Sequence, residues 1–223
     1  DLAQTQVNYA NLLHRQDRHR EAEKLYRNAG EYFKSTPNRV ATARCYYNRA
    51  NTLVQLFEIQ TAQELYEKAL EMWREAGCEL DACDARYGIA WLHMLIGRFH
   101  EAMTELSECE RTYRESGDPR GEALCVLDRA EVCLNLGLVH DAHRAAREAK
   151  KKFATLGLRY ETAKASLFLG QAALQLGNSS EAARLLAFAR RRFRIERNWG
   201  FVGVAILTEA ELATSVRMQA QRL

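Results

Sequence analysis

The sequence repeats with a period of forty residues, and this periodicity restricts the fold more than any single motif does. Four columns of similar residues keep one register over five consecutive units without a gap. Three columns hold small residues: Ala10, Ala50, Ala90, Ala130, Gly170 and Ala210; Ala22, Ala62, Ala102, Ala142 and Ala182; and Ala29, Ala69, Cys109, Ala149 and Ala189. The fourth is aromatic, with Phe33, Trp73, Tyr113, Phe153 and Phe193. One structural unit is therefore repeated along the chain.

The columns predict that this unit is a helical hairpin. Small residues are expected where two helices approach closely, because a larger side chain there would destabilise the fold by about 1–3 kcal/mol. The aromatic column follows the second small column by eleven residues, which is three turns along one helix, so its rings can fill the gap between neighbouring units. Between the first two columns lie Gly97, Gly137 and Gly177, and glycine ends a helix readily because it accepts a left-handed backbone.

The same signals set the expected boundaries of an almost entirely helical chain. The composition is that of a globular protein, with 47% hydrophobic residues, 27% charged residues and 2 prolines. We expect helices over 2–16 and 18–35 in the first unit, and one repeat domain over 1–223. The predicted repeats span 1–37, 38–79, 80–119, 120–159 and 160–200, and a terminal helix over 201–218 continues the first column through Ala210.

The turn segments give the pattern a likeness to a known family. Residues 96–102 read Ile-Gly-Arg-Phe-His-Glu-Ala, residues 136–142 read Leu-Gly-Leu-Val-His-Asp-Ala, and Tyr26 and Tyr66 stand four residues after the second small residue. This spacing resembles the tetratricopeptide repeat, in the longer variant of kinesin light chains, LGN/Pins adaptors and bacterial multidomain regulators. The resemblance implies an α-solenoid, a right-handed superhelix of five antiparallel helix pairs plus a C-terminal helix, whose first helices line a concave groove.

The residues expected in that groove form a candidate peptide-binding site. Asparagine offers both a donor and an acceptor, so Asn8, Asn11, Asn48 and Asn51 could hold a peptide backbone, a role that the resemblance implies for these four positions. Tyrosine and tryptophan are enriched as interface anchors. The other candidates are Arg44, Tyr47, Asp84, Tyr87, Trp91, Asp128 and Glu131. The alternative interpretation is that the asparagines are helix-surface residues and the aromatic residues pack between repeats.

Charge is distributed unevenly around a net value of +3. Residues 1–57 carry a net +4, residues 58–131 a net −9 and residues 132–200 a net +8. Within the basic part a candidate docking stripe recurs at the repeat interval, formed by Lys150, Lys151, Lys152, Arg190, Arg191 and Arg192. Such a stripe could attract an acidic partner or nucleic acid. A solvated helix face is the favoured interpretation, because aromatic interleaving is missing. The next option is a docking site for the acidic middle of another copy or for another domain of the parent protein, and nucleic-acid binding is the weaker alternative.

Catalytic and metal chemistry find little support in the sequence. The six cysteines form no Cys-x-x-Cys pair and read as small structural residues, which suits a reducing, cytoplasmic compartment. His140 and His143 lack a third ligand at a fitting spacing. Phosphate-binding loops and nucleophile elbows are missing. The longest stretch without Asp, Glu, Lys or Arg, 165–180, is too short to span a membrane. We therefore expect no enzyme, cofactor or metal.

The predicted function is a protein-interaction module that binds a peptide segment or a helix in the concave groove. The alternative is a regulatory or sensor domain of a larger signalling ATPase, transcription regulator or CHAT-type protease, acting by docking within its chain or onto a partner. The start at Asp1 and the unpaired last helix favour that alternative. Self-association through the apolar side of the last helix, with Val204, Ile206, Leu207 and Leu212, is compatible with both.

Overall fold

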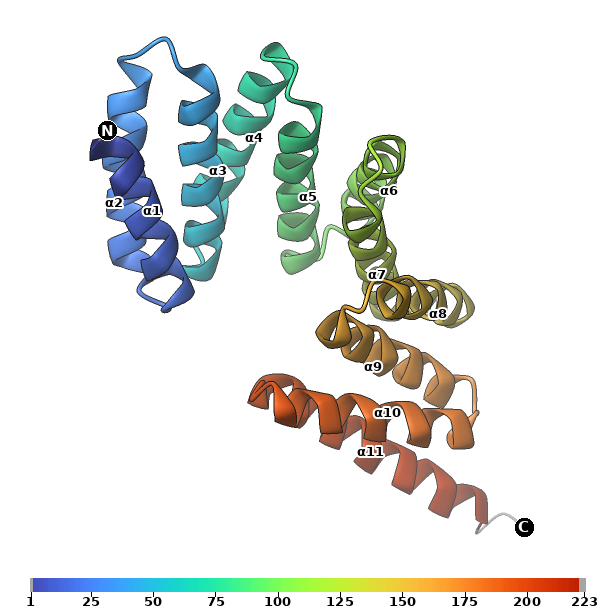
Figure 1. Cartoon of the computed structure of the whole chain (residues 1–223). Coiled ribbons are helices and arrows are strands. Elements are labelled where there is room, and N and C mark those ends of the chain that lie inside the picture. Colours follow the sequence, from blue (N-terminus) through green and yellow to red (C-terminus); the bar gives the residue numbers. More distant parts are fainter. Residues whose placement is uncertain (1, 221–223) are drawn as a thin grey trace. The chain divides into compact units, whose positions relative to one another are not determined.

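The computed structural model describes residues 2–220, and the side chains of all of these except residues 216 and 218–220. Over this range every regular element is an α-helix, and eleven helices follow one another along the chain (Figure 1). The helices are α1 Leu2–Arg15, α2 His19–Lys34, α3 Arg39–Gln55, α4 Ile59–Glu75, α5 Glu79–Leu95, α6 Phe99–Glu115, α7 Pro119–Asn135, α8 Val139–Thr155, α9 Arg159–Gln175, α10 Ser179–Ile195 and α11 Trp199–Ala220. The predicted all-α class is confirmed, and the predicted helix ends in the first unit are right to within one residue.

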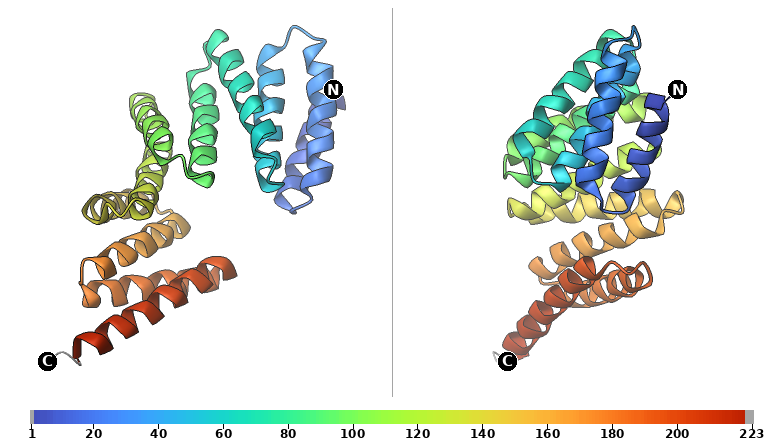
Figure 2. Two further views of the ribbon diagram at one scale, coloured as in Figure 1. Left: turned by 180° about the vertical axis from the view of Figure 1, so that it is seen from behind. Right: turned by 90° about the vertical axis from the view of Figure 1, so that its left-hand side faces the viewer.

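The helices group into two compact units, which are described separately. Unit 1, residues 1–116, holds α1–α6, and unit 2, residues 117–223, holds α7–α11. In each unit every helix packs against the next one in the chain, and successive odd-numbered helices also touch, as α1 does α3 and α9 does α11. Figure 2 shows that chain neighbours such as α10 and α11 run antiparallel. Each unit is a stack of helix pairs, as an α-solenoid requires. The superhelical path and the single-domain organisation stay predictions.

The small and aromatic columns form the core of these stacks. All members of the second and third small columns have 0% exposure, and no aromatic residue of the fourth column exceeds 5%. The first column is buried from Ala10 to Gly170, but Ala210 in α11 is exposed, contrary to the prediction. In the described part of the chain α11 packs on α10 and α9 alone, so its far side has no helix to bury it.

Nine of the ten turns between the described helices share one backbone conformation at multiples of twenty residues, and the α2–α3 turn, which contains Pro37, is the exception. Six glycines from Gly77 to Gly177 have φ between 70° and 78°. Asp17, Phe57 and Arg197 occupy the equivalent turns with φ of 59°, 61° and 56°, although L-residues rarely adopt this left-handed region. The register of the repeat therefore imposes the turn even where glycine, its usual sequence signal, is missing.

None of the helices, within the described residues, is long and apolar enough to cross a membrane. The same residues contain no group of three or more histidine, cysteine or acidic side chains that could hold a metal ion. The six cysteines are free thiols. Burial raises the pKa of Cys45 to about 11, so that thiol stays protonated at neutral pH.

Candidate functional site

In unit 1 two of the predicted asparagines are held by tyrosines of the following helix. The Tyr26 hydroxyl in α2 donates a hydrogen bond to Asn11 Oδ1 in α1 at 2.6 Å, and Tyr66 in α4 donates to Asn51 Oδ1 in α3 at 2.5 Å. Both tyrosines are buried, with 2% and 1% exposure. The two bonds repeat one geometry in consecutive units, so Asn11 and Asn51 are fixed in orientation and have their carbonyl oxygens occupied.

The first asparagine of each pair is more accessible to a ligand. Asn8 is exposed, and its Oδ1 accepts a bond from Gln4 Nε2 at 3.2 Å. Asn48 is half-buried, and its side chain has no hydrogen bond to any residue in the described part of the chain. An amide in this state retains two donors and an acceptor for a ligand, which makes Asn48 the strongest binding candidate on this face.

The asparagine column ends in the third repeat for a steric reason. Gly88 in α5 occupies the position equivalent to Asn8 and Asn48. A Cβ atom there would lie 2.6 Å from both Cε1 and Cζ of Tyr66. The ring that fixes Asn51 therefore needs a residue without a side chain on α5. The odd-numbered helices, to which α5 belongs, are termed the inner helices, after the groove that the sequence analysis predicts for them.

The predicted aromatic patch divides between packing and surface. The ring of Tyr47 lies 5.8 Å from that of Tyr66 and 5.5 Å from that of Trp73, so it packs between the repeats, as the alternative interpretation held. Burial raises the pKa of Tyr47, and a hydrogen bond from Asn51 opposes that rise. Tyr87 and Trp91 in α5 are half-buried, so part of each side chain reaches solvent.

The charged candidates of unit 1 are engaged by neighbouring side chains. Asp84 accepts a hydrogen bond from the Tyr113 hydroxyl of α6 at 2.7 Å. Burial, and secondarily the Asp84 carboxylate, raise the pKa of that tyrosine. Arg44 is exposed and lies 3.8 Å from the Asp81 carboxylate, at the edge of a cavity of about 180 Å³ between α1, α2 and α3. Exposed ion pairs of this kind contribute little to stability.

In unit 2 the inner helices enclose a larger cavity. It has a volume of about 360 Å³ and lies between α7, α9 and α11. Its walls combine the aromatic rings of Phe168 and Phe201 with the amide of Gln171 and the carboxylate of Glu131. The sequence analysis selected Glu131 alone. Register identifies two of the others, because Phe168 and Gln171 stand in the columns of Asn8 and Asn11.

The two acidic candidates of unit 2 do not form the acidic patch that their charges suggest. Lys164 Nζ in α9 lies 3.8 Å from Asp128 Oδ1 and 3.5 Å from Glu131 Oε2. The same ammonium group lies 5.4 Å from the centre of the Phe168 ring and 6.0 Å from that of Phe201. Asp128 is buried, with 4% exposure. Lys164, which the sequence analysis missed, thus opposes the charge of both carboxylates.

The pKa values around Lys164 follow from burial and charge. Burial raises the pKa of Glu131, and the Asp128 charge adds to this, while Lys164 opposes it. Burial alone would lower the pKa of Lys164, but the two carboxylates outweigh it and the net shift is upward. The lysine therefore stays protonated at neutral pH.

The predicted basic stripe is divided by ion pairs. Lys152 lies 3.1 Å from Glu122, Arg190 lies 3.1 Å from Glu209, and Arg192 lies 2.7 Å from Glu196. Lys151 and Arg191 are exposed. Lys150 instead lines a separate outer cavity. A docking role for the six residues as one continuous surface stays a prediction.

The residues expected to mediate self-association also separate. Ile206 and Leu207 are exposed to 44% and 67%, whereas Leu212 is buried with 8% exposure. Val204 lines the inner cavity of unit 2. An apolar contact between copies would therefore rest on Ile206 and Leu207.

Sequence comparison accounts for this architecture. Tetratricopeptide repeat models match residues 1–75 and, in a second form, residues 47–113 and 127–194. The chain belongs to the tetratricopeptide repeat (TPR) family. A comparison with curated protein sequences finds no significant match.

Three solved structures illustrate the likeness of fold. The chain is similar to a STAND protein with a tetratricopeptide repeat sensor from Pyrococcus horikoshii, with 18% identity and a TM-score of 0.77, over 91% of this chain and 31% of that protein. The TPR-like repeats of a putative kinesin light chain from Podosopora anserina give 15% identity and a TM-score of 0.68, over 87% and 96%. The Rap conjugation gene regulator of plasmid pLS20, in complex with the Phr* peptide, gives 14% identity and a TM-score of 0.77, over 90% of this chain and 55% of that protein. The chain therefore spans only about a third of the STAND protein and about half of the Rap regulator.

Proposed function

We propose that this TPR chain binds an extended peptide segment of a partner protein on its inner helices. The observation that carries the proposal is the pair of tyrosine-fixed asparagines, Asn11 and Asn51, each preceded three residues earlier by an asparagine that no tyrosine holds. Fixed amides lose little conformational freedom when they bind, and they pair with a peptide backbone whatever its side chains. The fold shared with a peptide-bound Rap regulator supports the proposal.

The inner cavity of unit 2 gives the same face a second contact of different chemistry. A space of about 360 Å³ lined by Phe168, Phe201 and Gln171 can accept an apolar side chain and hydrogen-bond the backbone next to it. We propose that this cavity anchors a side chain. We also propose that the module works in the cytoplasm, a reducing compartment that suits its free cysteines.

The proposal is tested with peptides selected from a random display library on the whole chain. The affinity of the best peptide is then measured by fluorescence anisotropy for the wild type and for Asn48→Ala. We expect Asn48→Ala to weaken binding about tenfold, which corresponds to the loss of one or two hydrogen bonds. The matched control is Asn28→Ala, which removes an exposed asparagine of α2. Equal affinity of the Asn48 variant and the wild type would exclude this face as the binding site.

A second candidate function is that of a sensor domain within a longer chain. The likeness to the STAND protein, whose TPR part is described as a sensor, favours it. Peptide binding would then control a neighbouring domain. The test is the full-length protein: the activity of a neighbouring catalytic or DNA-binding domain should respond to the selected peptide, and Asn48→Ala should abolish the response. A full-length protein without such a domain would refute this candidate.

A further inference from the structure

The outer side of unit 2 carries a furrow that the inner-face function does not use. A cavity of about 350 Å³ lies between α8 and α10, both of which pack against α9. Its apolar floor is formed by Leu169, Leu185 and Phe188. The two leucines are buried, with 3% and 8% exposure, whereas Phe188 is exposed to 38%. The floor therefore offers an apolar surface that is only partly covered by the fold.

Three basic side chains surround this floor. They are Arg147 and Lys150 from α8 and Arg184 from α10. Arg147 NH2 donates a hydrogen bond to Glu181 Oε1 at 3.2 Å. Lys150 and Arg184 form no ion pair or hydrogen bond with any residue in the described part of the chain. Two cations thus stand beside an apolar floor without an acidic partner.

The one acidic residue of the furrow is already engaged. Glu181 accepts hydrogen bonds from Asn178 Nδ2 at 2.9 Å and from Arg147, and its Oε2 lies 3.4 Å from His143 Nε2. Burial by itself would raise the pKa of Glu181, but the contacts with His143 and Arg147 outweigh it and lower the pKa. Glu181 is therefore ionised and paired with Arg147, and it leaves the charges of Lys150 and Arg184 uncompensated.

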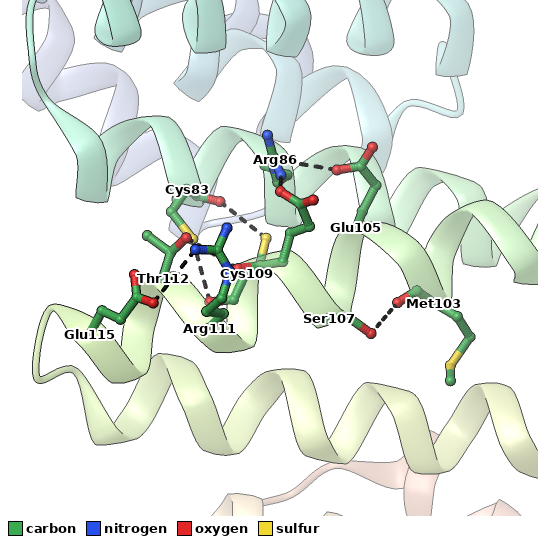
Figure 3. Close-up of polar contacts among 10 residues, drawn as sticks. Cys83, Arg86, Met103, Glu105, Ser107, Cys109, Arg111, Thr112 and Glu115 are labelled. Atoms are coloured by element: carbon green, nitrogen blue, oxygen red, sulfur yellow. Dashed lines mark hydrogen bonds and ion pairs between the residues drawn. The ribbon is translucent and has the colours of Figure 1, made fainter.

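The repeat itself does not require this combination of residues. Eighty residues earlier, the equivalents of Arg147, Arg184 and Phe188 in unit 1 are Glu67, Thr104 and Glu108. There Arg86 of α5 pairs with Glu105 of α6 (Figure 3). Arg86 also pairs with Glu108 of the same helix. The same position of the scaffold is thus acidic and internally paired in unit 1, but basic and apolar in unit 2.

We infer that the furrow between α8 and α10 is a second docking site, which binds an acidic segment of a partner protein. A large apolar side chain of that segment lies on Leu169, Leu185 and Phe188, and carboxylates beside it pair with Lys150 and Arg184. The volume suits one or two side chains rather than a folded domain. Charge complementarity favours an acidic partner, and a single exposed phenyl ring gives nucleic acid no row of stacking surfaces. This site is independent of the inner asparagines.

The experiment selects random peptides by display on the whole chain and counter-selects them on the double variant Lys150→Glu, Arg184→Glu. We expect the enriched peptides to combine Glu or Asp with Leu, Phe or Trp. Their affinity, measured by fluorescence anisotropy, should fall at least tenfold in the double variant and about fivefold in Phe188→Ala. It should also weaken as the salt concentration rises.

The matched control is Lys151→Glu, Arg191→Glu, which makes the same change of charge on α8 and α10 at exposed residues outside the furrow. Binding in this control should stay within about threefold of the wild type, and Asn48→Ala should bind as the wild type does. Enrichment of no peptide, of peptides without acidic residues, or an equal loss in the control would overturn the proposal. So would preferential binding of RNA, or a wild-type dimer that becomes a monomer in the double variant when measured by analytical ultracentrifugation.

Discussion

The inner faces of the two units occupy the same columns of the repeat with different chemistry. In unit 1 these columns hold Asn8, Asn11, Asn48 and Asn51, two of which are fixed by buried tyrosines. In unit 2 the equivalent positions hold Asp128, Glu131, Phe168 and Gln171, arranged around Lys164 and a cavity. The repeat therefore fixes the position of each side chain on the backbone. The residue type at that position decides whether the surface there is polar or apolar.

The tyrosines and asparagines of unit 1 occur together for a structural reason. Tyr26 and Tyr66 stand fifteen residues after Asn11 and Asn51. In the other three repeats the tyrosine column holds Leu106, Ala146 and Leu186, and the asparagine column holds Trp91, Glu131 and Gln171. A buried hydroxyl needs a partner, so the two residues of the pair depend on each other.

The largest effect on stability is expected from Gly88→Ala, which disrupts the contact between Tyr66 and Asn51 in unit 1. The added Cβ would lie 2.6 Å from the Tyr66 ring and displace it from Asn51. We expect the free energy of unfolding to fall by about 3 kcal/mol, although alanine has a better helix propensity than glycine. Urea denaturation gives the free energy, and amide hydrogen exchange should localise the loss to unit 1. Unchanged exchange in α3–α5 would contradict this account.

The second-largest effect on stability is expected from Lys164→Met, which removes the cation from the cluster of Lys164, Asp128 and Glu131 in unit 2. Removing the ammonium group leaves the buried Asp128 and the neighbouring Glu131 without this partner. We expect a loss of about 2 kcal/mol at pH 7, less than for a fully buried pair because Glu131 is partly exposed. The control Lys151→Met replaces an exposed lysine of α8 and should change the free energy by less than about 0.5 kcal/mol. Equal values for both variants would show that the cluster has no stabilising role.

A smaller, pH-dependent effect is expected from Tyr26→Phe. At pH 8 the loss of the bond to Asn11 should destabilise the chain by about 1 kcal/mol. Burial raises the pKa of Tyr26 to about 12 from an ordinary value of 10.0. The folded state therefore retains its proton above pH 10, and the stability from the neutral hydroxyl, complete below pH 10, is lost between pH 10 and 12. The difference between wild type and variant should shrink over that window, and a constant difference would refute the assignment.

The smallest effect is expected from Gly203→Ala in α11. A Cβ at this helical position would meet no atom within 4 Å. Because glycine lowers the stability of a helix interior, the substitution should stabilise unit 2 by about 0.5–1 kcal/mol. Thermal unfolding followed by circular dichroism provides the measurement. A lower midpoint would show that this helix face has a contact that the structure does not contain.

The sequence predicted the fold in more detail than it predicted the sites. The columns identified the core because a small or aromatic residue every forty positions has one simple cause, close packing at a fixed register. The turns at Asp17, Phe57 and Arg197 carry no glycine signal, and the predicted helices 2–16 and 18–35 located only the first of them. Contacts such as Tyr113 with Asp84, or Lys164 with Asp128, escaped prediction because they depend on where long side chains reach between neighbouring helices.

The sequence predicted candidate site residues only at positions that belong to a column of the repeat. The choice of Asn48 as a binding residue stays a prediction, whereas Tyr47 in the same helix packs between the repeats. The outer furrow of unit 2 was missed because Lys150 was grouped with its sequence neighbours rather than with Arg147 and Arg184.

The even spacing of the left-handed turns limits how the length of this chain can change. A single residue inserted within a helix would rotate everything after it by about 100° around the helix axis. The alanines that are buried between neighbouring helices would then point to solvent, and charged side chains would enter the space between the helices. Insertions and deletions are therefore compatible with folding at the turns but not between them, and any loop, tag or reporter grafted into this protein belongs next to a residue with positive φ.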